Sequence, residues 1–138
     1  MASGAEPTDR LVLDTTGYSH FRAGRAEALD WIAEATVVTV PVIVLGELDA
    51  AFRCGTRFEE NTRSLEEFLM EPFVEVAEVD RAVARRYGAL VAELRRNGTP
   101  IPVNDIWIAA TTMTVGGRLL TFDRDFERVP ALDCVVLR

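Results

Sequence analysis

Hydrophobic residues along this chain fall into short runs rich in β-branched residues, which alternate with longer stretches of helical spacing. The short runs predict strands at residues 10–13, 37–40, 73–76, 118–121 and 134–137. The longer stretches predict helices at residues 25–35, 41–54, 57–70, 81–97 and 105–114. Because strands that alternate with helices are typical of α/β proteins, we expect a parallel sheet of about five strands flanked by helices.

Polar and glycine residues mark the ends of several of these elements. Residues 15–18 are expected to end the first strand. Asp80 is a suitable N-cap for the long helix that follows it, and Gly98 stands at the other end of that helix. Asn104 is expected to cap the helix that opens at Asp105.

The composition is that of a globular protein. Its 138 residues, 49% of them hydrophobic, suffice to enclose one core, so we expect one domain at residues 10–138 after a disordered segment at residues 1–9. No apolar run is as long as a membrane span, which predicts a cytoplasmic protein without membrane contact. Cys54 and Cys134 have no cysteine or histidine nearby and are expected to be buried free thiols.

The charged residues exclude several kinds of chemistry. All 15 basic residues are arginine and His20 is the only histidine, which disfavours lysine-dependent phosphatases and receiver domains, histidine triads and zinc hydrolases. We expect His20 on a polar helix surface and interpret the five arginines between positions 81 and 96 as a solvated helix face. A net charge of −7 opposes nucleic acid binding unless the acids gather in a metal pocket, where bound cations reverse the local sign.

Three carboxylates are expected at one edge of the predicted sheet. Asp14 follows the first strand directly, and Asp123 lies two residues beyond the fourth. Asp105 opens a helix that returns over the same edge. Ligands of open parallel sheets gather outside the carboxyl ends of the strands, so these side chains are placed where a ligand would bind.

A fourth carboxylate, Glu47, lies on an apolar helical surface between Leu45 and Leu48. Burial of a carboxylate is costly unless a partner offsets its charge, and no base is visible nearby in the sequence, so a bound cation is the expected partner. Each acid taken alone also has an ordinary explanation as a turn, cap or surface residue. Together, in a chain without lysine or paired histidines, they favour hard oxygen ligation of Mg²⁺ or Mn²⁺.

Four segments carry these acids in the order VLDTTGYSHF, VIVLGELDAAF, NDIWIAAT and LLTFDRDF. In this order and spacing they resemble the acidic motifs of the PIN-domain family, especially its VapC-type toxins, over nearly the whole chain from Arg10 onward. The resemblance implies a single PIN-like domain in which the catalytic acids are Asp14, Glu47, Asp105 and Asp123. It also implies that Thr15 and Thr121 orient carboxylates and that Asn104 supports the site.

Two positions depart from the family pattern or leave it open. Thr16 stands where relatives commonly have Asn or Ser, and it keeps a hydroxyl group. Some relatives place the fourth acid just before the phenylalanine, which would select Asp125 instead of Asp123; we prefer Asp123 because it lies closer to the strand end. Asp49, close to Glu47 in sequence, is expected to face solvent.

The resemblance implies metal-dependent hydrolysis of single-stranded RNA. Asp14 and Asp105 would anchor Mg²⁺ or Mn²⁺, with Glu47 and Asp123 as secondary ligands and water as the nucleophile. Arginines near the motifs are candidates for holding phosphate: Arg22, Arg25 and Arg53.

The resemblance also implies partners. A cognate small antitoxin of the VapB type would silence the enzyme, with an arginine entering the acidic pocket, and the toxin would form a homodimer. The alternatives at this point are a metal-dependent DNA nuclease and a catalytically idle PIN fold that binds other proteins.

Overall fold

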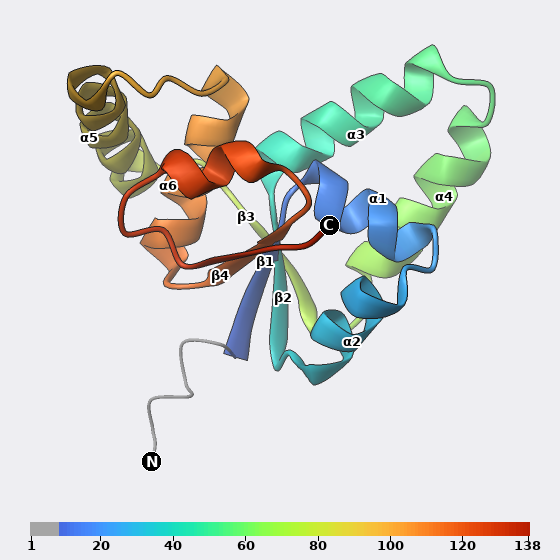
Figure 1. Cartoon of the computed structure of the whole chain (residues 1–138). Helices are drawn as coiled ribbons and strands as arrows, with labels where there is room; N and C mark the ends of the chain where they lie inside the picture. Colours follow the sequence, from blue (N-terminus) through green and yellow to red (C-terminus); the bar gives the residue numbers. More distant parts are fainter. Residues whose placement is uncertain (1–8) are drawn as a thin grey trace.

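The computed structural model describes residues 9–138 and contains a central sheet with helices on both sides (Figure 1). Its strands are β1 (Arg10–Leu13), β2 (Val37–Pro41), β3 (Val74–Ala77), β4 (Arg118–Thr121) and β5 (Cys134–Val136). All neighbouring strands are parallel, in the order β3-β2-β1-β4-β5. The predicted α/β fold with a five-stranded parallel sheet is confirmed, whereas residues 1–8 of the segment predicted to be disordered lie outside the described residues.

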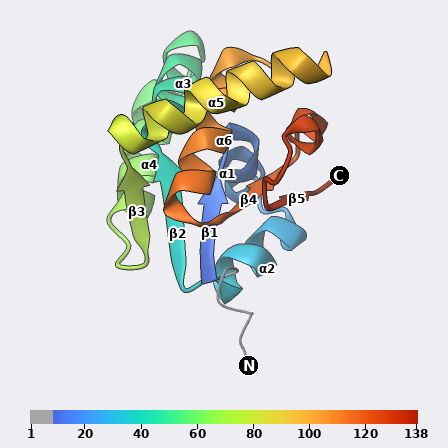
Figure 2. The same cartoon turned by 90° about the vertical axis from the view of Figure 1, so that its left-hand side faces the viewer.

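The helices form layers on the two faces of this sheet. In chain order they are α1 (Thr15–Arg22), α2 (Ala26–Glu34), α3 (Val42–Cys54), α4 (Phe58–Leu69), α5 (Arg81–Asn97), α6 (Val103–Val115) and the short 3₁₀ helix η2 (Arg124–Arg128). Helices α1, α2 and α4 lie on one side of the sheet, while α5 and α6 lie on the other (Figures 1 and 2). Within residues 9–138, no helix is both long and apolar enough to cross a bilayer.

Helix α1 is the element that the hydrophobic pattern missed. Residues 15–18 were expected only to break the strand, but Asp14 accepts a hydrogen bond from the backbone N–H of Gly17 at 2.7 Å and thereby caps a helix. A Cβ atom on Gly17 would lie 2.5 Å from the carbonyl oxygen of Leu120. Glycine therefore permits α1 to pack directly against β4.

The predicted cap of the last long helix was wrong. Helix α6 begins at Val103, and its N-cap is Pro102, whose side chain accepts no capping hydrogen bond. Asn104 is consequently the second residue of the helix rather than its cap. The fixed φ of proline prepares the chain for the first helical turn without a polar cap, which explains the earlier start.

The prediction of two buried cysteines was also wrong. Cys54 is the last residue of α3 and is exposed, because this end of the helix extends away from the sheet (Figure 1). Cys134 lies on the edge strand β5 and is partly buried. Burial raises the pKa of the Cys134 thiol, and the neighbouring acids Asp133 and Glu127 raise it further.

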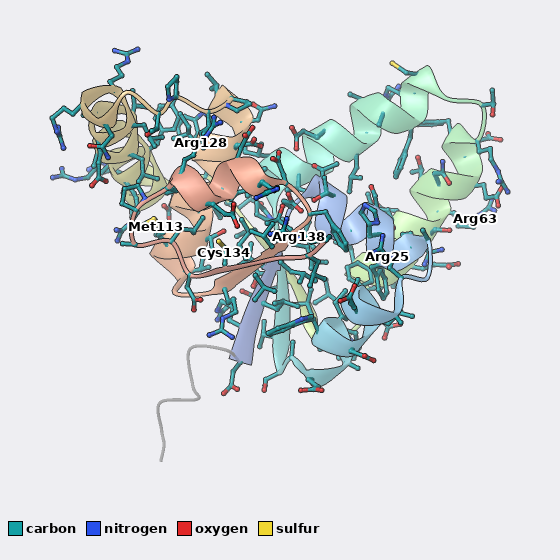
Figure 3. All side chains as sticks on the ribbon, in the orientation of Figure 1. Arg25, Arg63, Met113, Arg128, Cys134 and Arg138 are labelled. Carbon is teal, nitrogen blue, oxygen red and sulfur yellow. The ribbon has the colours of Figure 1, made fainter. Side chains whose placement is uncertain are left out.

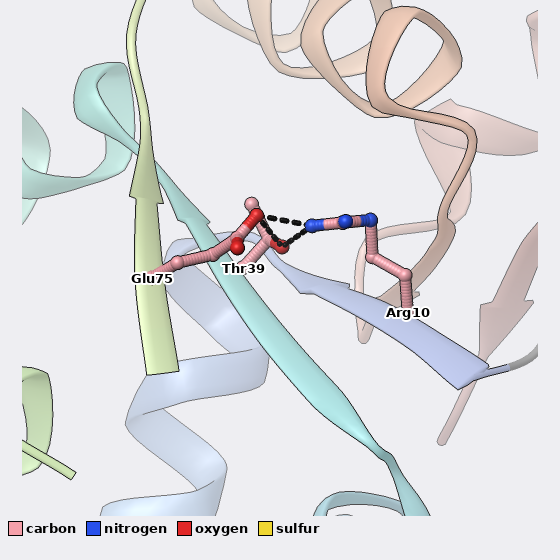
Figure 4. A network of polar contacts seen from close by, with 3 residues as sticks. All are labelled: Arg10, Thr39 and Glu75. Atoms are coloured by element: carbon pink, nitrogen blue, oxygen red, sulfur yellow. Dashed lines mark hydrogen bonds and ion pairs between the residues drawn. The ribbon is translucent and has the colours of Figure 1, made fainter. Parts of the chain in front are cut away.

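The three central strands supply seven of the twelve largest fully buried side chains, and one polar network crosses the sheet. Arg10 on β1 donates to the Thr39 hydroxyl on β2 at 3.0 Å and also contacts Glu75 on β3 (Figure 4). Thr39 in turn donates to Glu75 at 3.2 Å. Because Thr39 is fully buried, its hydroxyl needs these partners, and the network fixes three neighbouring strands.

The contact of α1 with β4 generates a stability prediction. Gly17→Ala should lower the free energy of unfolding by about 1–3 kcal/mol, because the new methyl group meets the backbone oxygen of Leu120, which cannot rotate away. Urea denaturation followed by circular dichroism measures the change. Gly88→Ala is the matched control, since no atom lies within 4 Å of a Cβ at that position of α5 and alanine favours the helix there by about 0.5–1 kcal/mol. Equal stability of the two variants would contradict the close packing of α1.

Candidate metal centre

Asp14 is a buried carboxylate at the carboxyl end of β1. It is 3% exposed and accepts hydrogen bonds from three donors. These are the backbone N–H of Gly17 at 2.7 Å, the Thr121 hydroxyl at 2.5 Å and the Thr16 hydroxyl at 2.8 Å. Burial raises the pKa of Asp14, while these donors partly oppose the shift by stabilising the anion. The carboxylate is therefore held in one orientation.

Two threonines connect Asp14 with the chain that follows β4. The hydroxyl of Thr16 accepts a hydrogen bond from the backbone N–H of Phe122 at 2.9 Å, and that of Thr121 accepts one from the N–H of Asp123 at 2.9 Å. Each hydroxyl thus donates to Asp14 and accepts from the β4 loop. Thr16, the departure from the family pattern, keeps a direct contact with the first acid.

Glu47 lies on α3 and receives hydrogen bonds from two other helices. The Thr15 hydroxyl of α1 donates to it at 2.5 Å, and the Asn104 amide of α6 donates at 3.2 Å. We expected a cation as its partner; the structure supplies two neutral donors, which leave the negative charge of Glu47 in place. Asn104 lies 57 positions away in sequence, so no local pattern could reveal this contact.

Asp105, in the first turn of α6, has the most strongly shifted pKa among the acids of the site. Its pKa is raised from the ordinary 3.8 to about 7, first by burial and then by the negative charges of four other acids. In decreasing order of effect these acids are Asp123, Glu47, Asp14 and Asp125. The other three acids predicted from sequence therefore lie near enough to Asp105 for their charges to act on it, although they come from separate elements.

Asp123 and Asp125 both lie beside Asp105. One carboxylate oxygen from each of the three residues lies within 4.8 Å of the other two. Asp123 accepts the backbone N–H of Asp125 at 2.9 Å and so caps η2. Asp125 also forms an ion pair with Arg128 at 3.6 Å, whereas within residues 9–138 Asp123 has none. The preference for Asp123 as fourth acid remains a prediction, and the pairing with Arg128 supports it.

The arginines predicted to hold phosphate make their contacts away from the acids of the site. Arg53 pairs with Asp49 at 2.6 Å, in keeping with the expected solvent-facing position of Asp49. Arg25 donates to the backbone oxygen of Arg138 at 2.6 Å, and Arg22 is exposed at the end of α1 (Figure 3 labels Arg25 and Arg138). Across residues 9–138, no arginine is ion-paired with the four predicted catalytic acids.

His20 is less exposed than the sequence suggested. Its ring stacks on that of Phe122 with centroids 3.8 Å apart, and the Arg25 guanidinium lies 5.1 Å from the Phe122 centroid. These contacts cover the residue between Thr121 and Asp123. The stack therefore stabilises the loop that carries the fourth acid.

Matches to other proteins span almost the whole length of the chain. Residues 11–132 match the family described as the PIN domain. The chain belongs to the PIN-domain family. It is similar to Ribonuclease VapC4 of Mycobacterium tuberculosis, with 32% identity over 98 residues that make up 71% of this chain and 75% of the relative.

Solved structures extend this PIN fold to nearly all of the chain. VapBC2 from Rickettsia felis, bound to a promoter DNA fragment, matches with a TM-score of 0.82 and 24% identity, over 94% of this chain and 99% of the other. VapBC-5 from Mycobacterium tuberculosis, a member of the VapBC family of toxin–antitoxin systems, matches with a TM-score of 0.72 and 27% identity, over 94% and 98%. The PIN-domain and VapC-type resemblance of the sequence is confirmed.

The donor set of this PIN domain fits a hard divalent cation. The site offers carboxylate oxygens, with neither histidine nor cysteine among them, and such ligands suit Mg²⁺ or Mn²⁺. The pKa of Asp105 is raised first by burial and then by the charges of the neighbouring acids, and a bound cation would offset both effects. Sequence reasoning missed Arg128 at this site; its spacing of three residues from Asp125 on a helical turn was the available signal.

The acidity of Asp105 predicts how stability depends on pH in EDTA. Unfolded Asp105 loses its proton near pH 3.8, whereas the folded protein keeps it up to about pH 7. Between these values the folded state binds more protons, so the free energy of unfolding should fall as the pH rises through this range. Thermal melts at pH 5 and pH 8 measure the effect, and addition of Mg²⁺ should reduce the loss at pH 8.

Asp105→Asn tests whether charge crowding causes that loss. Removal of this charge should raise the free energy of unfolding at pH 8 in EDTA by about 1 kcal/mol, because it removes repulsion between Asp105 and the other acids. The gain is limited because solvent reaches the half-buried side chain and screens part of that repulsion. Asp49→Asn is the control, since Asp49 lies outside the site and pairs with Arg53. A melting temperature of Asp105→Asn at or below that of the parent protein at pH 8 would contradict crowding.

Proposed function

We propose that this PIN domain is a metal-dependent endoribonuclease that cleaves single-stranded RNA and acts in the cytoplasm as the toxin of a type II toxin–antitoxin pair. The observation that carries the proposal is the gathering of acids around Asp105, whose pKa burial and then the charges of these acids raise to about 7. Similarity to Ribonuclease VapC4 supports the choice of RNA as substrate.

The proposed roles follow the positions of the acids. Asp14 and Asp105 would hold Mg²⁺ or Mn²⁺, with Glu47 and Asp123 as secondary ligands. When bound, the divalent cation supplies a water of lowered pKa as nucleophile and offsets negative charge on the leaving oxygen. Thr121 and Thr16 orient Asp14, and Thr15 and Asn104 orient Glu47 through the hydrogen bonds described above.

The protonation of Asp105 adds a feature to this proposal. In the absence of a cation, a carboxyl group with a pKa of about 7 is largely protonated at mildly acidic pH. Since a carboxylate must lose its proton to bind a metal, cation binding at Asp105 releases a proton. Metal affinity should therefore rise with pH up to about 7, and the site is ready for a cation near neutrality.

Activity measurements test the proposal directly. The protein freed of antitoxin should cleave single-stranded RNA in Mg²⁺ or Mn²⁺ and stop in EDTA. Asp14→Ala or Asp105→Ala should lower cleavage by on the order of a hundredfold or more while the fold is retained, because loss of one ligand lowers metal occupancy and misplaces the nucleophile together. Gel analysis of labelled RNA, with circular dichroism of each variant, provides the measurement.

Asp49→Ala is the matched control for these activity variants. It removes a carboxylate from α3 that pairs with Arg53 outside the site, so cleavage should be unchanged. Cleavage that continues in EDTA, or in both site variants, would refute the role of the acids. A preference for single-stranded DNA would identify a DNA nuclease instead, and a protein that cleaves neither would be a catalytically idle binding module.

A surface hollow between α1, α2 and α4 is the place where we propose that the antitoxin binds. Its volume is about 550 Å³, and apolar side chains dominate its lining: Phe21, Leu29, Ile32, Phe68 and Phe73. Leu29 and Phe73 are 41% and 37% exposed. The relation of VapBC-5 to toxin–antitoxin systems supports a small protein partner with an apolar segment for this hollow. An arginine of that partner would be attracted to the acids of the metal centre.

Leu29→Glu should weaken antitoxin binding by about tenfold or more, because a carboxylate replaces an apolar side chain in the hollow. Cleavage of RNA by the antitoxin-free variant should be unchanged. Calorimetric titration with the antitoxin measures the affinity, and Met70→Glu, at an exposed residue outside the hollow, is the control. Equal affinity of the two variants would exclude the hollow. Loss of self-association by Leu29→Glu alone would assign it to a second copy of the chain.

A further inference from the structure

The outer face of α5 concentrates arginine in an otherwise acidic protein. The helix carries five arginines and a single acid, Glu93, whereas the whole chain has a net charge of −7. Side chains tipped with nitrogen extend outward from α5 at the left of Figure 3. The positive face of α5 is therefore suited to a negatively charged partner.

Three of these arginines follow one line along the helix. Arg85 lies four residues after Arg81, and Arg96 lies eleven after Arg85, which corresponds to about one and three turns. The residues that α5 buries are on the opposite side: Val83, Leu90 and Leu94. At about 1.5 Å per residue, the line from Arg81 to Arg96 is about 22 Å long.

These arginines differ from most others in the chain by lacking acidic partners. Seven arginines elsewhere form ion pairs: Arg10, Arg25, Arg53, Arg57, Arg118, Arg124 and Arg128. Within residues 9–138, none of the five on α5 does. A guanidinium without a partner remains available for a phosphate, to which it donates through two N–H groups at once.

The C-terminal end of the face lies beside the start of α6, the helix that carries Asp105. Arg95, near its C-terminal end, lines a cavity of about 180 Å³ between α5 and the start of α6, together with Tyr87 and Ile106. Ile106 is the neighbour of Asp105 in the first turn of α6. Tyr87 stacks on Trp107 of α6 with ring centroids 3.8 Å apart, which fixes the two helices against each other. A strand held along α5 would therefore lie beside the helix that carries Asp105.

We infer that the α5 arginine face, defined by Arg81, Arg85, Arg95 and Arg96, binds the phosphate backbone of the single-stranded RNA substrate. The inference rests on the proposed function. A cation held by the acids acts on the phosphate that is cleaved, so the rest of the substrate strand needs attraction from another surface. A symmetric contact of two such faces would oppose like charges, which disfavours a second copy of this chain as the occupant.

The test compares two double variants of equal net charge. Arg85→Gln/Arg96→Gln removes two charges from the arginine face, and Arg57→Gln/Arg63→Gln removes two beside or within α4, on the other side of the molecule (Figure 3 labels Arg63). Glutamine is a good helix former, and circular dichroism checks that both variants fold. Anisotropy of a labelled single-stranded oligoribonucleotide in EDTA measures affinity at several salt concentrations.

Binding by the α5 variant should weaken on the order of tenfold at physiological salt, and its salt slope should fall by about 1.4, because each phosphate contact of a single strand contributes about 0.7. The control should bind like the parent protein. In Mg²⁺, the α5 variant should show a raised KM for long RNA and an unchanged kcat, since its acids are intact.

Equal affinity of the two double variants would overturn the inference. Loss of antitoxin binding by the α5 variant without loss of RNA affinity would also overturn it and assign the face to an acidic protein segment. If the parent protein binds RNA through α5 but cleaves none in Mg²⁺, the proposed function fails while the arginine face stands. The same protein variants therefore distinguish failure of the proposed activity from failure of RNA binding by α5.

Discussion

The site depends on a buried carboxylate that is held by hydrogen bonds from three directions. Asp14 caps α1, receives the hydroxyls of Thr16 and Thr121, and through them is linked to the loop after β4. Burial of the charge would be unfavourable without these donors. The close approach of α1 to β4, which Gly17 permits, brings the donors into range. Local packing and candidate chemistry thus share the same contacts.

The remaining acids lie around Asp105. Burial, and then the charges of Asp123, Glu47, Asp14 and Asp125, raise the pKa of Asp105 to about 7. Folding alone would favour fewer charges at this place, since each adds repulsion that neutral donors do not remove. A divalent cation would offset the repulsion, so the crowding that is expected to lower stability in EDTA would also prepare the site for a metal.

Charge is distributed between two regions of this PIN domain. The carboxyl end of the sheet is negative, while the arginine face of α5 is positive and free of ion pairs within residues 9–138. A nuclease needs both signs, because a cation held by acids acts on the phosphate while arginines hold the rest of the strand. The net charge of −7 is therefore a poor guide to the partner, and the separation of acids from arginines is a better one.

The sequence alone determined the sheet, most helices and the order of the acids, because hydrophobic periodicity is local and each of Asp14 and Asp123 follows a strand. It could not reveal that α1 begins at Thr15, since a glycine there suggests a break until its contact with Leu120 is known. Only the tertiary structure decided that Asn104 donates to Glu47 and that Asp125 joins Asp105. These outcomes depend on distances between segments far apart in the chain, and such distances are set by the packing of helices on the sheet.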